Sequence, residues 1–281
     1  MLRIAVPNKG SLSEPAAVML REAGYRQRRD SKELVLVDHE NDVEFFFLRP
    51  RDIAVYVGSG QLELGITGRD LLLDAGVAAE EVLQLGFARS TFRYAAMPGT
   101  VETVHDFTGK RVATSYAGLV SKHLSDLGVQ AEVIRLDGAV ETSIRLGVAD
   151  IVADVVETGT TLRHAGLEVL GETILESEAV LISRHDAPLS AARHQLIRRL
   201  QGVLVARKYV LMDYDIPAEL VAQATVIAPG FESPTVSPLA NGGWVAVRVL
   251  VPRTDAQRVM DELWELGARA ILSTRVDAAR I

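Results

Sequence analysis

A hydroxyl-rich turn in the middle of the chain is the strongest chemical signal in the sequence. The apolar stretch 151–156, interrupted by Asp154, leads into Thr158-Gly159-Thr160-Thr161, where a helix is expected to begin. Free backbone amides at a helix start bind phosphate groups, and a glycine lets the ligand approach closely. Asp154 could accept hydrogen bonds from the hydroxyls of a sugar. A helix cap at Thr158 and a turn role for Asp154 explain the same residues, so both interpretations stay open at this point.

Four cationic residues stand where expected strands end. Lys9 follows the first apolar stretch, Arg49 and Arg51 follow another, and Arg69 follows a third. In open α/β sheets, ligands bind at the carboxyl ends of the strands. A solvent-exposed surface charge explains each of these residues alone. Together, in a chain of net charge −7, they indicate a site for a pyrophosphate or a triphosphate.

Several other classes of site find no support. The chain has no cysteine, and its six histidines show no metal-ligand spacing. It lacks the Gly-x-Ser-x-Gly, Gly-x-Gly-x-x-Gly and Walker patterns of hydrolases, dinucleotide oxidoreductases and P-loop NTPases. Because acidic residues exceed basic ones by 37 to 30, a nucleic-acid surface is not expected. Without a signal peptide or a membrane span, a soluble cytoplasmic protein with no membrane partner is expected.

The elements that must position these residues alternate between apolar strands and amphipathic helices, as in an α/β protein. A chain of 281 residues favours two or three domains. A long helix is expected over 188–205, and the pattern changes after it. Strands at 208–214, 225–228, 244–251 and 270–274, with helices at 217–224 and 254–266, give a βαββαβ order, which is typical of a ferredoxin-like domain.

The expected organisation is therefore two α/β lobes followed by a small third domain. Lobe I comprises residues 1–90 and 184–205, and lobe II comprises residues 91–183 with the hydroxyl-rich turn. Residues 206–281 form the C-terminal domain.

At this stage the sequence resembles the long form of the ATP phosphoribosyltransferase family, whose members open histidine biosynthesis. Residues 141–162, from Glu141 through Asp154 to Thr161 and Leu162, fit the long signature of that family at every fixed position. The resemblance covers the whole chain. Shorter segments that carry it are Pro7-Asn8-Lys9-Gly10, Phe45-Phe-Phe-Leu-Arg49-Pro50, Gly65-Ile-Thr-Gly68-Arg69-Asp70, Leu136-Asp137-Gly138 and Gly230-Phe-Glu-Ser233-Pro234-Thr235.

The resemblance implies a reaction of ATP with phosphoribosyl pyrophosphate (PRPP), which gives N1-(5-phosphoribosyl)-ATP and pyrophosphate. Mg²⁺ is implied as the cofactor, carried mainly by the substrate phosphates. Adenine N1 attacks with its own lone pair, so no protein nucleophile is needed, and positioning and charge stabilisation supply the rate. The resemblance also implies two lobes like those of periplasmic binding proteins, with the ligand in the cleft between them.

The resemblance assigns roles to individual residues. Lys9, Arg49 and Arg51 are expected around the pyrophosphate, and Thr158, Gly159, Thr160 and Thr161 around the PRPP 5-phosphate. Asp154 and Glu141 are expected at the ribose hydroxyls, and Asp70 and Tyr116 in the nucleotide region. The chain departs from the expected family pattern at Glu157, Thr160 and Tyr116-Ala117-Gly118, which leaves the detailed nucleotide contacts open.

The C-terminal domain is expected to bind L-histidine as a feedback inhibitor. Six residues are expected at this effector site: Asp215, Phe231, Ser233, Thr235, Leu250 and Ala270. The alternative is that the domain only joins subunits and that Asp215 caps the following helix. The family implies a homo-oligomer, from dimers to a hexamer.

Two non-enzymatic functions compete with this interpretation, because the same two lobes serve in solute-binding proteins and in the effector domains of regulators. The first expected strand begins at residue 2, which leaves no room for a helix-turn-helix. A third alternative, a regulatory protein that uses its tail alone, is weakened by the intact phosphate turn.

Overall fold

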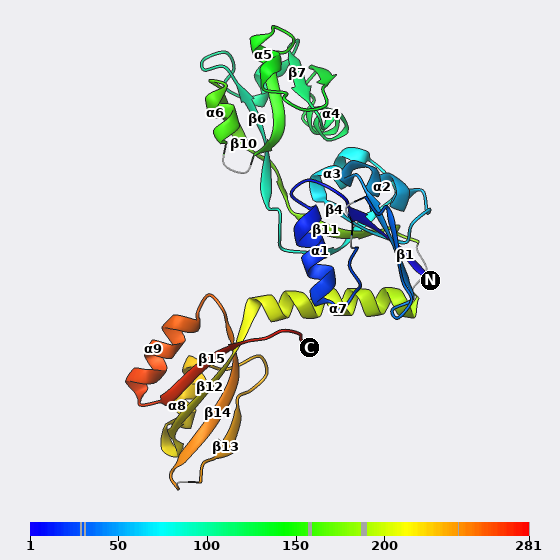
Figure 1. Cartoon of the computed structure of the whole chain (residues 1–281). Helices are drawn as coiled ribbons and strands as arrows, with labels where there is room; N and C mark the ends of the chain where they lie inside the picture. Colours follow the sequence, from blue (N-terminus) through cyan, green and yellow to red (C-terminus); the bar gives the residue numbers. More distant parts are fainter. Residues whose placement is uncertain (29, 31, 157–158, 187–189, 241, 281) are drawn as a thin grey trace. The chain divides into compact units, whose positions relative to one another are not determined.

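The computed structural model in Figure 1 describes residues 1–28, 30, 32–156, 159–186, 190–240 and 242–280. The chain divides into two compact units. The first comprises Met1–Leu20 and Tyr25–His194, and the second comprises Arg21–Gly24 and Gln195–Ile281. Within the described residues, no helix combines the length and the apolar character that crossing a membrane requires.

The first unit begins with a mixed sheet in the order β2-β3-β1-β4-β11-β5. Its strands are β1 (Leu2–Pro7), β2 (Val35–Asp38), β3 (Val43–Leu48), β4 (Leu64–Gly68), β5 (Glu80–Gln84) and β11 (Ala179–Ser183). The helices α1 (Ser13–Glu22), α2 (Pro50–Gly58) and α3 (Arg69–Ala75) follow β1, β3 and β4. β1 pairs in parallel with both β3 and β4, so the carboxyl ends of these three strands share one edge.

Helix α2 is fixed closely on β4. A Cβ atom at Gly65 would lie 2.5 Å from Cγ2 of Ile53, so only glycine allows this approach. The Thr67 hydroxyl donates to the Pro50 carbonyl oxygen at 2.9 Å and ties the start of α2 to the end of β4. This packing fixes the positions of Arg49 and Arg51, at the start of α2, relative to the end of β4.

The second sheet of the first unit has the order β10-β6-β9-β7-β8. Its strands are β6 (Ser90–Ala96), β7 (Arg111–Thr114), β8 (Glu132–Arg135), β9 (Ile151–Val156) and β10 (Glu168–Ser177). The helical segments are η1 (Val104–Phe107), α4 (Ala117–Asp126), α5 (Thr142–Arg145) and α6 (Thr160–His164). Phe92, Phe107, Val112 and Ile151 are fully buried in its core.

Two crossings join the sheets, from β5 to β6 and from β10 back to β11. β11 pairs with β4 and β5 in the first sheet, although the sequence analysis assigned residues 179–183 to lobe II. All five residues of β11 are buried, and a strand with this apolar run needs a neighbour on each edge. The polar strand β5, which begins with Glu80 and Glu81, was not predicted.

In the second unit, α7 (Ala191–Lys208) leads into β12 (Tyr209–Pro217), η2 (Ala218–Leu220), α8 (Val221–Ile227), β13 (Thr235–Pro238), β14 (Trp244–Pro252), α9 (Ala256–Leu266) and β15 (Arg269–Arg275). The division between the units falls inside α7, after His194, whereas the sequence analysis placed the whole stretch 184–205 in lobe I. The sheet order β13-β14-β12-β15, with every pair antiparallel, is that of the expected ferredoxin-like domain.

One strand of this domain was predicted in the wrong place. Residues 225–227 complete α8, Ala228 is its C-cap, and the second strand lies at Thr235–Pro238. The β-branched run Thr225-Val226-Ile227 suggested a strand. However, Ala224 and Ala228 are both buried one helical turn apart, and the Thr225 hydroxyl donates to the Val221 carbonyl oxygen at 2.8 Å. Helix packing therefore overrides the local propensity. The fold class itself, two α/β lobes with a ferredoxin-like C-terminal domain, is confirmed.

Candidate active site

A cavity of about 170 Å³ lies where the two lobes of the first unit meet. Its walls come from the carboxyl ends of β1 and β4, the start of α2, the crossings between the sheets, the segment before α4, and β9. The lining residues on which the site depends are Lys9, Gly10, Pro50, Asp70, Ser90, Tyr116, Val155 and Ser177. Segments far apart in the sequence therefore converge at one place, as expected for a ligand between two lobes.

Two cations stand at the rim of this edge. Pro7 of β1 and Leu48 of β3 are register partners, so Lys9 and Arg49 leave the sheet from adjacent strands. Both side chains are exposed, and neither has a hydrogen-bond or ion-pair partner within the described residues. Unpartnered cations at neighbouring strand ends are free to bind an anion.

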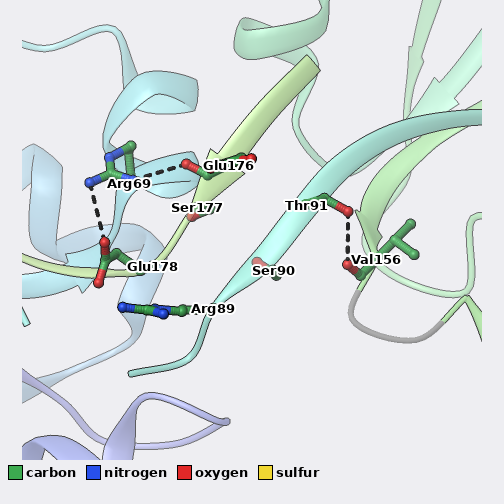
Figure 2. Close-up of a pocket in the computed structure, with 8 residues that line it drawn as sticks. All are labelled: Arg69, Arg89, Ser90, Thr91, Val156, Glu176, Ser177 and Glu178. Atoms are coloured by element: carbon green, nitrogen blue, oxygen red, sulfur yellow. Dashed lines mark hydrogen bonds and ion pairs between the residues drawn. The ribbon is translucent and has the colours of Figure 1, made fainter. Parts of the chain in front are cut away.

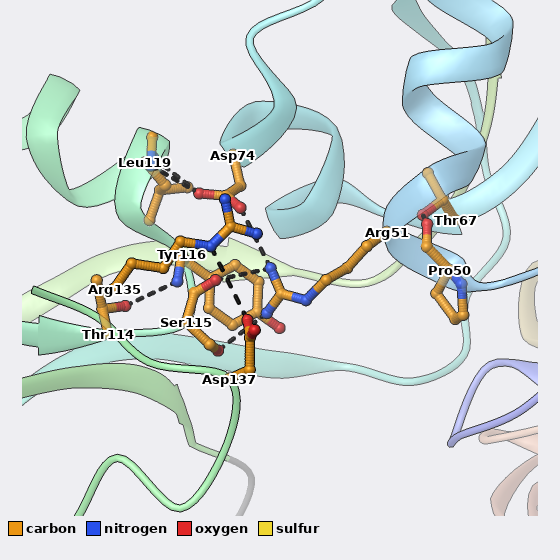
Figure 3. A network of polar contacts seen from close by, with 11 residues as sticks. Pro50, Arg51, Thr67, Asp74, Thr114, Ser115, Tyr116, Leu119, Arg135 and Asp137 are labelled. Atoms are coloured by element: carbon orange, nitrogen blue, oxygen red, sulfur yellow. Dashed lines mark hydrogen bonds and ion pairs between the residues drawn. The ribbon is translucent and has the colours of Figure 1, made fainter. Parts of the chain in front are cut away.

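Arg51, by contrast, is fully engaged with the second lobe (Figure 3). Its Nη1 donates to the Ser115 carbonyl oxygen at 2.7 Å, and its Nη2 donates to the Ser115 hydroxyl at 2.9 Å. Nη1 also lies 3.3 Å from Oδ2 of Asp74. The guanidinium carbon stands 4.4 Å from the centroid of the Tyr116 ring. Arg51 therefore bridges the two lobes in this structure.

Asp70 is buried in the first turn of α3 and exchanges two hydrogen bonds with Ser177. Its backbone amide donates to the Ser177 hydroxyl at 3.1 Å, and that hydroxyl donates to Asp70 Oδ1 at 2.8 Å. Burial, followed by the nearby Asp70 charge, raises the pKa of Tyr116. Tyr116 therefore stays protonated at neutral pH, with its ring edge-to-face against Phe92 at 5.1 Å.

Asp154 lies near the end of β9, half-buried. Burial raises the pKa of its carboxyl group above the ordinary value, although the Val155 backbone amide, which donates to Oδ1 at 2.8 Å, opposes this shift. The negative charges of Glu141 and Asp70 raise the pKa further, and the Arg51 guanidinium lowers it. A buried carboxyl group with a raised pKa and charged neighbours is a candidate member of a functional site.

The hydroxyl-rich turn is described from Gly159 onward, and Glu157 and Thr158 lie outside the described residues. Gly159 has φ +70°, which explains the glycine, and it precedes α6, where Thr160 and Thr161 are exposed. Arg163, which the sequence analysis did not single out, donates from Nη2 to the Thr160 hydroxyl at 3.3 Å. A guanidinium therefore stands beside the turn even though Thr160 itself carries no charge.

Glu141 is not among the residues that line the cleft cavity. It precedes α5 and lines a separate cavity of about 510 Å³ with Met97, Arg145 and His164. Its negative charge nevertheless reaches Asp154, whose pKa it raises.

The crossings between the lobes enclose another cavity, of about 530 Å³, shown in Figure 2. Arg69 does not offer a free cation there, contrary to the sequence-based grouping. Its Nε and Nη2 donate to both carboxylate oxygens of Glu81 at 2.9 and 3.0 Å, and Nη1 donates to the Glu176 carbonyl oxygen. Arg89, which the sequence analysis missed, lines the same cavity and has no polar partner in the described part of the chain.

In the second unit, α8 and α9 cover one face of the sheet, and the expected effector residues lie on the opposite face or at its rim. Asp215 and Ala246 are register partners, as are Leu211 and Leu250, and Thr235 and Arg248, so these side chains share one face. Ala270 adopts φ +50° at a bulge between β12 and β15, beside Asp215. The Phe231 ring contacts Tyr209 edge-to-face at 5.9 Å.

These effector residues are not brought together at one point. Asp215 pairs with Ala246, which is four residues along β14 from Leu250, a separation of about 13 Å at ~3.3 Å per residue. Asp215 makes no helix-capping hydrogen bond within the described residues. The structure therefore leaves the Asp215 carboxylate available and spreads the expected site along the sheet.

No group of three His, Cys, Asp or Glu side chains suited to a metal ion occurs within the described ranges. The Asp70 carboxylate lines the cleft cavity, and the Asp154 carboxylate, which is not among the lining residues, is close enough for the two charges to repel each other. Mg²⁺ is usually held by one or two carboxylates together with substrate phosphates, and these two residues fit that arrangement.

Known proteins resemble the chain along its whole length. The sequence profile described as ATP phosphoribosyltransferase (HisG) matches residues 49–202, and the profile of the HisG C-terminal domain matches residues 206–278. The ATP phosphoribosyltransferase of Streptomyces avermitilis is 64% identical over 285 residues, and that of Arthrobacter sp. is 65% identical over 286. Both alignments cover 100% of each chain.

A solved structure, the ATP phosphoribosyl transferase (HisG:HisZ) complex from Thermotoga maritima, also resembles this one. Its TM-score is 0.63 at 26% identity, over 73% of this chain and 98% of that one. The match to the C-terminal profile indicates the long form. The chain is a pentosyltransferase of histidine biosynthesis, and it belongs to the ATP phosphoribosyltransferase family.

Proposed function

We propose that the chain transfers the 5-phosphoribosyl group of PRPP to N1 of ATP, with release of pyrophosphate, in the cleft between its two lobes. One observation carries the proposal: Lys9, Asp70 and Tyr116 converge at one cavity, with Arg49 at the adjacent strand end. They do so in a chain whose full-length relatives are ATP phosphoribosyltransferases. The reaction is the first step of histidine biosynthesis.

The reaction needs no nucleophilic side chain from the protein. Adenine N1 forms the new bond to ribose C1 with its own lone pair, while the bond from C1 to the pyrophosphate oxygen breaks and the electron pair leaves with pyrophosphate. Lys9 and Arg49, both without a partner in the described part of the chain, bind the pyrophosphate as its charge grows. Arg51 acts beside them from its position over Tyr116.

The opposite end of PRPP lies at the hydroxyl-rich turn. Thr158, Gly159, Thr160 and Thr161 hold the 5-phosphate through amides and hydroxyls, and Arg163 adds a positive charge beside Thr160. Asp154 accepts hydrogen bonds from the ribose hydroxyls. Glu141 adds a negative charge close enough to act on Asp154. Asp70 and Tyr116 contact the nucleotide, and the protonated Tyr116 hydroxyl acts as a donor.

Mg²⁺ enters mainly with the substrate phosphates, and Asp70 and Asp154 are the carboxylates that would help to hold it. The ion, when bound, neutralises phosphate charge. Its presence would also offset the repulsion that raises the pKa of Asp154.

The C-terminal domain binds L-histidine and inhibits the enzyme, as the long form implies. Asp215 pairs with the ammonium or imidazole group, and Ser233, Thr235 and the backbone of the 230–235 loop supply polar contacts. Because Asp215 and Leu250 lie about 13 Å apart in one chain, a site shared between two copies accounts for their separation. This supports a homo-oligomer, from dimers to a hexamer, which works in the cytoplasm.

The test mixes the protein with ATP, PRPP and Mg²⁺ and follows ultraviolet absorbance, because N1-substituted adenine absorbs differently from ATP. We expect a time-dependent change that requires both substrates and stops when EDTA removes the metal. A protein that binds ATP and PRPP in calorimetry but produces no absorbance change and no pyrophosphate would be a binding module, and the proposed reaction would be wrong.

A further inference from the structure

Asp74 joins the two lobes directly through one carboxylate oxygen, and its other oxygen contacts Arg51, which itself lies in the first lobe. It lies on α3 in the first lobe, and its Oδ1 accepts hydrogen bonds from the backbone amides of Gly118 and Leu119 in the second lobe, at 2.9 and 3.2 Å. Its Oδ2 lies 3.3 Å from Arg51 Nη1. Figure 3 shows the carboxylate between the guanidinium and the start of α4. The Asp74 side chain is 16% exposed, so solvent screens this contact only in part.

Helix α4 has no cap of its own. Tyr116 occupies the N-cap position and makes no capping hydrogen bond through its side chain. The first amides of a helix need acceptors, and a carboxylate there also interacts favourably with the helix dipole. Asp74 therefore supplies from the first lobe the cap that α4 lacks in its own sequence.

Gly118 makes this approach possible. A Cβ atom at this position would lie 2.2 Å from the backbone carbonyl oxygen of Asp74, which is far below any contact that real side chains make. Gly118 does not adopt a positive φ, so the backbone conformation does not require glycine. Alanine is the better residue inside a helix. The glycine is therefore explained by the closeness of α3 and α4.

The same contact fixes side chains that face the cleft. Arg51, which pairs with Asp74, donates to the carbonyl oxygen and hydroxyl of Ser115 and covers the Tyr116 ring. Tyr116 in turn lies close enough to Asp70 for the Asp70 charge to raise the pKa of Tyr116. Asp74 is thus the point from which the start of α4, Arg51 and Tyr116 are held in one arrangement.

From this geometry we infer that Asp74 is a positioning residue of the reaction, which holds the lobes closed and orients Arg51 and Tyr116 without touching the substrates. Gly118 is the residue that permits the contact. If only the closed state binds substrates well, the apparent dissociation constant rises as the closed fraction falls. The inference rests on the proposed placement of the substrates in the cleft, but closure can be measured without them.

The experiment compares Gly118→Ala with Ser121→Ala, an exposed position on the same helix where alanine also favours the helix but lies away from Asp74. The chain has no cysteine, so Ser59→Cys and Ser125→Cys can carry a pair of spin labels, one on each lobe. Labelled subunits are diluted into unlabelled ones to isolate distances within one chain. Without substrates, Gly118→Ala should shift the label distance to longer values, and Ser121→Ala should leave it unchanged.

Steady-state kinetics give the second measurement. Gly118→Ala should raise KM for both substrates by about tenfold, equivalent to ~1.4 kcal/mol, with a smaller change in kcat. Of the three variants, Asp74→Ala should raise KM the most. Asp74→Asn, which keeps an acceptor for the amides but loses the charge, should raise KM by an amount between those of Gly118→Ala and Asp74→Ala.

Unchanged label distances together with unchanged KM values in folded Gly118→Ala protein would overturn the inference. So would a lower melting temperature with kinetics unchanged per folded molecule, because that result assigns Asp74 a structural role alone. A shifted label distance with unchanged KM values would retain the closure contact but contradict its link to the reaction and the cleft placement. If the parent protein has no transferase activity, the proposed function fails, while the label distances still test the contact.

Discussion

The cleft of the first unit and the C-terminal sheet gather their candidate residues differently. In the cleft, Lys9, Asp70 and Tyr116 come from separate segments yet line one cavity of about 170 Å³. On the sheet, Asp215 and Leu250 share a face but stand four register positions apart along β14. The cleft residues therefore meet within one chain, whereas the expected effector residues on the sheet stay apart. Changes in the cleft should affect catalysis directly, and changes on the sheet should affect inhibition alone.

The largest effect is expected from Gly159→Val, which tests the catalytic side of this comparison. Gly159 has φ +70°, and a Cβ atom there would lie 3.2 Å from Arg163 Nη1, so valine would both strain the turn and obstruct the phosphate. We expect kcat/KM for PRPP to fall by on the order of a hundredfold or more, ~2.7 kcal/mol or more of barrier.

Gly166→Val is the matched control for this variant. Gly166 has φ +76° at the other end of α6, so valine there imposes similar backbone strain away from the turn. Melting temperatures should fall alike in the two variants, and only Gly159→Val should lose PRPP kinetics. Near-normal PRPP kinetics in folded Gly159→Val protein would remove the turn from the substrate site.

Arg49→Lys should have the next largest effect. A guanidinium can donate two parallel hydrogen bonds to a phosphate, which an ammonium group cannot reproduce although the charge is kept. We expect activity to fall about tenfold or more, ~1.4 kcal/mol, in a pyrophosphate-release assay. Arg253→Lys, an exposed substitution in the C-terminal domain, should change nothing. Wild-type kcat/KM for both substrates in Arg49→Lys would exclude direct phosphate binding.

Much of the fold could be predicted from local patterns, because strands such as β1, β3 and β9 are mainly apolar runs, each interrupted by a single charged residue. β5 escaped prediction because its glutamates suit an edge strand, and 225–228 misled because β-branched residues also occur in packed helices. Lys9 and Arg49 were singled out from their place after apolar runs, and the structure exposes both at adjacent strand ends, while their role in binding stays a prediction. Asp74 and Ser177 carried no signal, since each acts on a segment from a distant part of the chain, and no local pattern records such a pairing.

The regulatory side of the comparison is tested by Ser233→Phe in the full-length protein. The large ring should block the 230–235 loop, so catalysis should stay normal while histidine inhibition is lost. The inhibition constant should rise by roughly 5–150-fold, the range of ~1–3 kcal/mol of coupling. Gln257→Phe adds the same ring to the exposed surface of α9, and inhibition should remain. Unchanged inhibition of Ser233→Phe, or inhibition of the unaltered protein that competes with PRPP, would place the effector site elsewhere.

The smallest expected effect is on the stability of the folded protein, through the buried carboxyl group of Asp154. Burial raises the pKa of Asp154 in the folded protein above the unfolded value, so folding favours the protonated carboxyl group. The stability that it contributes is fully present below the unfolded pKa, about 3.9, and is lost as pH rises through the raised folded value. Above the raised pKa the carboxylate is ionised at a cost in stability, and Asp154→Asn removes that cost while its side-chain oxygen can still accept from Val155.

We therefore expect Asp154→Asn to melt a few degrees higher than the unaltered protein at pH 7, since ~1 kcal/mol corresponds to about 2–4 °C in a chain of this size class. The difference should shrink as pH falls toward the raised pKa. Asp137→Asn, at a side chain that is 87% exposed, should show no such pH-dependent gain. A lower melting temperature for Asp154→Asn at every pH would mean that the carboxylate is stabilised within the protein. In that case the ionised Asp154 carboxylate would not destabilise the protein, and this contrast between the cleft and the C-terminal sheet would not exist.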